Sequence, residues 1–73
     1  PDLEDKITAA LKQLSQDAYH PILHTHKLKG NLAGSLACKV DFEYLIVFEF
    51  VKDRDTKEEI ILLEAIGTHD EVY

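Results

Sequence analysis

The chain of 73 residues has the length of one small domain, and its eight basic and fourteen acidic side chains leave a net charge of −6. Such a domain buries only about 60% of the surface that its unfolded chain exposes, so its core is small. The single cysteine excludes an internal disulfide and fits a reducing compartment. No apolar run approaches the about 20 residues of a membrane helix, and no secretory signal is visible. These features predict one cytoplasmic domain, residues 1–73, that does not enter a membrane.

Charge is distributed unevenly along the chain. Residues 20–40 contain Lys27, Lys29 and Lys39 and no acidic side chain, whereas the other segments carry five basic and fourteen acidic groups. A negative net charge argues against tight non-specific binding of nucleic acid, which normally needs a basic surface. The lysine segment could still hold a phosphate group within this acidic body.

The N-terminal segment has the pattern of an amphipathic helix over residues 3–15. Asp2 stands at the N-cap position, and acidic side chains follow in the first turn, where they interact favourably with the helix dipole. Pro21 disfavours helical backbone at the residue before it, so residues 16–23 are predicted as a loop with room for one helical turn at residues 17–19. The apolar side chains predicted to face the core are Leu3, Ile7, Ala10, Leu11 and Leu14.

Three strands are predicted after this loop. Residues 35–40 alternate between apolar and polar, as in a strand with one buried face. Residues 44–51 and 59–66 are rich in β-branched and aromatic side chains and apolar on both faces. Short connections at residues 41–43 and 52–58 would join them as an antiparallel meander. The predicted fold is α+β, with the N-terminal helix packed on a three-stranded antiparallel sheet.

This architecture leaves one gap. A single helix covers only one face of a sheet, yet two of the predicted strands are apolar on both faces. We therefore expect an N-terminal strand and the first part of a longer helix to be missing, or a second copy of the chain to cover the sheet. Pro1, in place of an initiator methionine, indicates that residues once preceded it.

Two histidines, His26 and His69, each lie in a short polar break beside an apolar run. Histidine is the side chain whose unperturbed pKa lies nearest neutrality, so a pair that meets on one surface would be a candidate acid–base site. The alternative interpretation is that both are ordinary surface residues in loops. A sheet that folds back on itself between them would bring them together.

A zinc site is a further alternative, because imidazoles are common zinc ligands and His24 and His26 would share one face of a strand with His69 nearby. No carboxylate stands at a familiar ligand spacing, and Cys38 has no second cysteine. We therefore predict no metal and no cofactor. His20, directly before Pro21, is assigned no role.

Five short motifs follow one another from the end of the loop to the end of the chain: His26-x-Leu28-x-Gly30, Asn31-Leu32-Ala33-Gly34, Ala37-Cys38-Lys39-Val40, Tyr44-Leu45-Ile46-Val47-Phe48 and Gly67-Thr68-His69-Asp70-Glu71-Val72-Tyr73. In their order and spacing they resemble the RelE/ParE toxin superfamily, and they are most similar to its YafQ-like, RelE/StbE-type branch. The resemblance implies a small antiparallel sheet with helices on one face. Members normally begin with a strand and a longer helical hairpin, so this would be a RelE-like toxin domain without its first strand.

The resemblance also implies a function. Members of this branch are toxins of bacterial type II toxin–antitoxin systems that cleave mRNA on the ribosome without a metal and are neutralised by a cognate antitoxin. Two other functions stay open. One is a non-catalytic module that has kept only the antitoxin-binding surface, and the other is a gyrase poison, as in a sister branch.

Four catalytic residues follow from the resemblance. His26 and His69 match the active-site histidines and would act as the acid–base pair for RNA cleavage. Glu43 stands where the branch has an acid and would orient an imidazole or assist as base. Lys39 stands at a position that is often histidine or another basic residue, and it would stabilise charge on the phosphorane.

Four residues are predicted to bind substrate. Lys27 and Lys29 would hold phosphates as point charges, while Tyr44 and the terminal aromatic Tyr73 would stack on bases. Leu45 occupies the position of an arginine in the RelE branch, which removes one phosphate-stabilising charge.

Partners follow from the same reasoning. The antitoxin in this family is a partly disordered chain that folds as it wraps the toxin. A missing first strand would also leave an unpaired sheet edge, a site for a homodimer contact or a partner strand.

Overall fold

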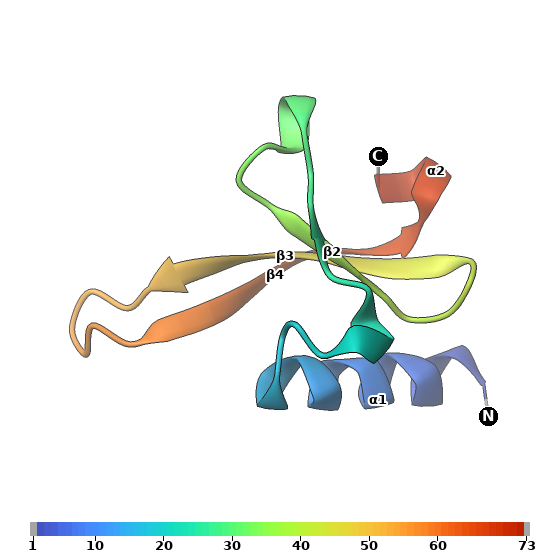
Figure 1. Cartoon of the computed structure of the whole chain (residues 1–73), viewed down its shortest axis with the longest axis horizontal. Coiled ribbons are helices and arrows are strands. Elements are labelled where there is room, and N and C mark those ends of the chain that lie inside the picture. The colour runs from blue at the N-terminus through green and yellow to red at the C-terminus, as the bar shows by residue number, and fades with distance from the viewer. Residues whose placement is uncertain (1, 73) are drawn as a thin grey trace.

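The computed structural model describes residues 2–72. A helix lies along one face of a four-stranded antiparallel sheet, and a short helix after the last strand lies on the other face (Figure 1). The α+β class is therefore confirmed. The elements, in chain order, are α1 (Leu3–Gln16), the 3₁₀ turn η1 (Pro21–Leu23), β1 (His26–Lys27), the 3₁₀ turn η2 (Gly30–Leu32), β2 (Leu36–Lys39), β3 (Tyr44–Lys52), β4 (Glu59–Thr68) and α2 (His69–Val72).

The sheet has the order β1-β2-β3-β4, so the prediction of three strands was one strand short. The additional strand, β1, consists of His26 and Lys27, which pair with Ala37 and Leu36. Two residues are too few to show a period of two, which is why the sequence pattern did not reveal this strand. This pairing fixes His26 to the sheet.

Helix α1 begins and ends close to where its sequence predicts. The Asp2 carboxylate accepts a hydrogen bond from the Asp5 N–H at 3.0 Å, which confirms the predicted N-cap. Ala10 and Leu14 on its inner face are buried. The following loop contains a hydrogen-bonded turn at the predicted residues 17–19, closed by the His20 N–H, which donates to the Asp17 carbonyl at 3.1 Å. The 3₁₀ turn η1 comes next, and the ring of His20 caps it by accepting a hydrogen bond from the Ile22 N–H at 3.1 Å.

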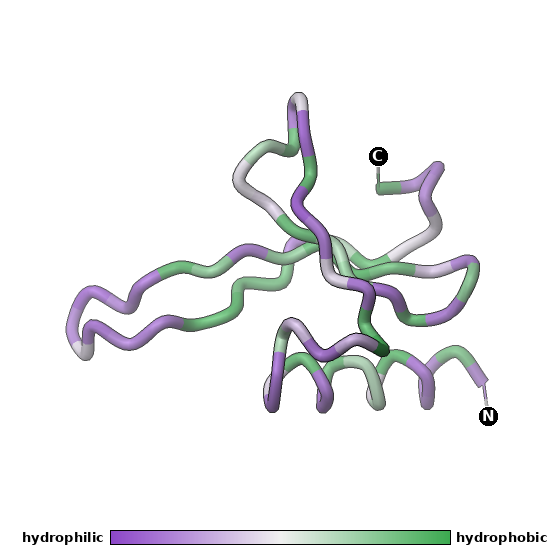
Figure 2. The backbone as a smooth tube through the Cα atoms, viewed as in Figure 1, coloured by the Kyte–Doolittle hydropathy of each residue, from purple (hydrophilic) through white to green (hydrophobic). Residues whose placement is uncertain are grey.

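The core lies on both faces of β3, which confirms it as a central strand. Ile46 and Phe48 face α1, whereas Leu45 and Val47 face the opposite side, where α2 packs. All four are at most 3% exposed. Hydrophobic residues accordingly run along the strands, while the far end of the β3–β4 hairpin is hydrophilic (Figure 2).

A β-bulge interrupts the pairing of β3 with β4. Val47 pairs with Ala65 and Phe48 with Leu63, so Glu64 is an extra residue without a partner in the ladder. Its carboxylate accepts a hydrogen bond from the buried Ser35 hydroxyl at 2.5 Å, which places it above β3.

Strand β4 is an edge of the sheet, and it exposes apolar side chains on both faces. The exposed fractions are 45% for Ile60, 49% for Leu62, 45% for Leu63 and 43% for Ile66. The sequence predicted apolar strand faces that a single helix could not cover, and these exposed side chains of β4 are such uncovered positions.

Candidate active site

One end of the sheet holds a cavity of about 310 Å³, between the start of β1, the β2–β3 connection and the start of α2. Two predicted catalytic histidines from distant parts of the sequence, His26 and His69, both line it. The lining residues are His24, His26, Cys38, Lys39, Asp41, Phe42, Tyr44, Leu45 and His69.

Strand register explains this convergence. His26 pairs with Ala37, two residues before Lys39 on β2. Lys39 in turn pairs with Leu45, which pairs with Gly67. Because directly paired residues share one face of a sheet, His26, Lys39 and the strand end that leads into His69 all lie on the face opposite α1.

The orientation of His26 is set by a local hydrogen bond. Its Nδ1 lies 3.0 Å from the carbonyl oxygen of His24. A carbonyl can only accept, so a neutral His26 ring carries its hydrogen on Nδ1 and its lone pair on Nε2. His24 adopts the left-handed conformation at φ 49° where it ends η1. The imidazole of His26 therefore has a defined tautomer, as a general base requires.

A capping box positions His69. The Thr68 N–H donates to the Glu71 carboxylate at 2.8 Å, and the Glu71 N–H donates to the Thr68 hydroxyl at 3.4 Å. This pattern, threonine followed three residues later by glutamate, was visible in the sequence and would have predicted α2, which was instead interpreted as a polar break. It turns the chain sharply after β4 and places His69 at the first helical position.

Gly67 has no side chain, which lets α2 pack closely against the end of β4. We expect Gly67→Ala to displace α2 from the sheet. An added Cβ would lie 3.0 Å from the Glu71 Oε1 and 3.2 Å from the Val72 Cγ1. Overpacking of this kind costs about 1–3 kcal/mol, which urea unfolding would measure. Thr68→Ser keeps the capping hydroxyl and should change stability by less than about 0.5 kcal/mol. Equal unfolding free energies for both variants would show that α2 is not held by this contact.

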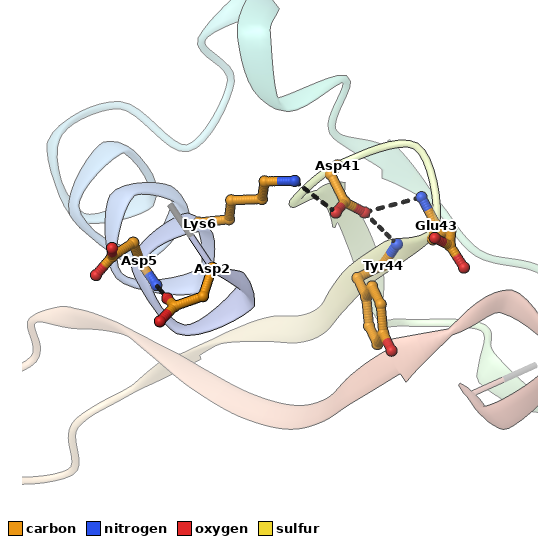
Figure 3. A network of polar contacts seen from close by, with 6 residues as sticks. All are labelled: Asp2, Asp5, Lys6, Asp41, Glu43 and Tyr44. Atoms are coloured by element: carbon orange, nitrogen blue, oxygen red, sulfur yellow. Dashed lines mark hydrogen bonds and ion pairs between the residues drawn. The ribbon is translucent and has the colours of Figure 1, made fainter.

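The loop between β2 and β3 is held by Asp41. Its Oδ1 accepts hydrogen bonds from the N–H groups of Glu43 and Tyr44, both at 2.8 Å, and its Oδ2 pairs with the Lys6 Nζ at 3.4 Å (Figure 3). The Tyr44 bond first, and then that of Glu43, hold the pKa of Asp41 below the usual value of an aspartate. Asp41 thus ties the rim of the cavity to helix α1.

The sequence matches no family model, and no curated protein is similar to it in sequence. Solved structures are similar in fold. A YoeB/ParE toxin from Agrobacterium tumefaciens superposes with a TM-score of 0.72 at 16% identity, over 92% of this chain and 74% of the other. A copper-bound mutant toxin from Helicobacter pylori gives a TM-score of 0.67 at 23% identity, over 93% and 72%. The chain shares the fold of these two toxins.

Within this fold, the structure brings together four of the predicted site residues, His26, His69, Lys39 and Tyr44, around one cavity. Leu45, in the position where the resemblance expects arginine, forms an apolar and buried part of the lining.

The other predicted residues lie elsewhere or are not described. Glu43 is exposed on the β2–β3 loop and is not part of the cavity lining. Lys27 and Lys29 border separate hollows on either side of Leu28. Tyr73 falls outside the described residues.

Five lining residues were not assigned to the site by sequence reasoning: His24, Cys38, Asp41, Phe42 and Leu45. A signal existed for Phe42, because an aromatic side chain in a connection as short as residues 41–43 has little opportunity to be buried. The roles of His24 and Asp41 depend on backbone geometry that the sequence does not display.

The zinc alternative gains no support. Within residues 2–72, no group of three or more His, Cys, Asp or Glu side chains is arranged to hold a metal ion. Burial, only partly offset by a backbone hydrogen bond with Ile46, raises the pKa of the Cys38 thiol to about 11. Cys38 is therefore a neutral thiol at pH 7, whereas a metal ligand must be a thiolate.

The described helices include none with the length and hydrophobicity that crossing a membrane requires.

Proposed function

We propose that this chain is the toxin of a type II toxin–antitoxin system and cleaves mRNA on the ribosome by histidine acid–base chemistry, without a metal. The observation that supports this proposal is the convergence of His26, His69 and Lys39 on one cavity in a fold shared with named toxins. A general acid, a general base and a cation are the three groups that metal-free RNA cleavage needs.

The chemistry assigns one task to each group. One imidazole removes the proton from the ribose 2′-hydroxyl, whose oxygen then attacks the adjacent phosphorus. The other imidazole donates a proton to the 5′-oxygen as the phosphorus–oxygen bond breaks. Lys39 stabilises the additional negative charge on the phosphorane. The contact of His26 Nδ1 with the His24 carbonyl at 3.0 Å orients the imidazole for its part in this proton transfer.

The acidic net charge of −6 is unfavourable for RNA binding. A domain of this charge binds RNA weakly, because its long-range field repels phosphates. The charge therefore favours the non-catalytic alternative, in which the chain only binds an antitoxin.

Inducible expression of the chain in a bacterial host tests this function. Growth arrest accompanied by cleaved messages would support the endonuclease. Arrest with DNA damage and intact messages would instead support gyrase poisoning. Absence of arrest would support the non-catalytic module, an alternative favoured by Leu45, which leaves the cavity without the arginine charge of the RelE branch.

We also propose that a partner strand, from the antitoxin or from a second copy, pairs with the edge of β4. The exposed backbone and the apolar side chains on both faces of this edge favour strand addition. We expect sedimentation velocity to show a dimer for the isolated chain, or a complex when antitoxin is present. Leu62→Lys should weaken either association at least about tenfold, since it places a charge in an apolar contact.

Ile22→Lys is the matched control for this prediction. Ile22 is 65% exposed and belongs to η1 rather than to the β4 edge, so its change should leave association unaltered. A wild-type chain that stays monomeric and binds no antitoxin would contradict the proposed role of the edge.

A further inference from the structure

Phe42 is the most exposed large hydrophobic side chain in the described part of the chain, at 83%. The other two phenylalanines are packed: Phe48 is fully buried, and Phe50 contacts both Phe48 and Tyr19. A single exposed apolar residue is ordinary on a protein surface. Phe42 differs from the ordinary case because it lines the cavity that contains His26 and His69.

The loop that carries Phe42 is fixed by hydrogen bonds on both sides of the ring. The N–H groups of Val40 and Asp41 donate to the Tyr44 carbonyl at 2.9 and 3.3 Å. The Asp41 carboxylate closes the loop from within and is paired with Lys6 on α1 (Figure 3). An aromatic ring on a backbone held in this way loses little further freedom when a ligand covers it.

The groups around Phe42 indicate the chemistry of that ligand. Lys39 and His69 line the same cavity and can donate hydrogen bonds to phosphate oxygens. Asp41, the acidic group of the lining, has its charge offset by Lys6 at 3.4 Å. A flat ring beside cationic and hydrogen-bonding groups matches a nucleotide, which has a planar base and an anionic phosphate.

We propose that Phe42 is a stacking platform for a nucleobase of the RNA, next to the phosphate that is cleaved. The proposal rests on the function proposed above and assigns it a base-binding subsite. Every base has a π-face, so a base of any identity can stack on the ring of Phe42. The larger purine bases would bury more area against the ring than pyrimidines. Phe42 therefore also favours a purine at the cleavage site.

The test measures binding of short fluorescent 2′-O-methyl RNA at low salt, because this RNA lacks the attacking hydroxyl and stays intact. Phe42→Leu keeps an apolar side chain without the ring and should weaken binding about 5- to 150-fold, the range for one stacked base. Phe42→Trp should bind as tightly as wild type or tighter. The preference for oligo-adenylate over oligo-uridylate should fall in Phe42→Leu.

Tyr19→Leu is the matched control, since Tyr19 is an aromatic residue with 60% exposure whose ring packs on Phe50, outside the cavity lining. It should bind RNA like wild type. Equal affinities of wild type and Phe42→Leu, or equal losses in Phe42→Leu and Phe42→Trp, would overturn the stacking role.

Other outcomes separate the two proposals. If Phe42→Leu weakens antitoxin binding and leaves RNA binding and message cleavage unchanged, Phe42 is a protein contact and the base subsite is rejected. If wild type neither binds the oligonucleotide nor cleaves message on ribosomes, the endonuclease function fails, and the subsite fails with it.

Discussion

Replacing His69 by alanine should lower the rate of message cleavage by about 10²–10⁴-fold, the usual contribution of one general acid or base. The imidazole is held at the start of α2 by a capping box that does not involve its side chain, so the local fold should survive. Single-turnover cleavage on programmed ribosomes is the appropriate measurement, because it reports the chemical step separately from ribosome binding.

His26→Ala should cause a similar loss, and the double variant should be little slower than either single one. The effects of an acid and a base that act in the same reaction are not additive, since removing either one already disables the cleavage. His20→Ala is the control, because His20 caps η1 and is not part of the cavity lining. A wild-type rate in His69→Ala would remove this residue from the mechanism.

The second large effect concerns the core. Phe48→Ala should destabilise the domain by about 3–5 kcal/mol, the cost of truncating a fully buried phenylalanine. The ring packs edge-on against Phe50 at 5.6 Å between centroids, and this contact would also be lost. A domain of 73 residues has a total stability of only about 4–11 kcal/mol. We therefore expect a large unfolded fraction at 37 °C, visible by circular dichroism and urea titration.

Phe42→Ala provides the control for this change, since it removes the same ring from a site that is 83% exposed. Its unfolding free energy should differ from wild type by less than about 0.5 kcal/mol. Similar losses in the two variants would mean that Phe48 does not lie at the centre of the core.

The elements that the sequence predicted are those whose residues carry periodic patterns. Helix α1 has apolar residues at helical spacing and an N-cap, while β3 and β4 are long enough to show strand composition. Among the strands and α-helices, the two that were missed, β1 and α2, have two and four residues. Elements this short are stabilised by pairing and capping contacts with distant or neighbouring residues, not by their own propensity.

The site was predictable to the extent that it depends on the sheet. A meander places the ends of its strands together, so the approach of His26 and His69 could be expected. The lysines could not be assigned in the same way. Lys27 follows His26 on β1, and successive side chains of a strand point to opposite faces, so this pair cannot serve one surface. Counting positive charges in a segment ignores that alternation.

The bulge at Glu64 has a consequence for how this sheet tolerates changes in length. Side chains on β4 alternate, so a shift by one position exchanges the two faces. Glu64, as the extra residue, separates the alternation of side chains near the hairpin tip from the alternation at the strand end that leads to His69. Insertions or deletions near the tip can be absorbed there, and the end of the sheet that leads to His69 can keep its alignment while the distal end diverges.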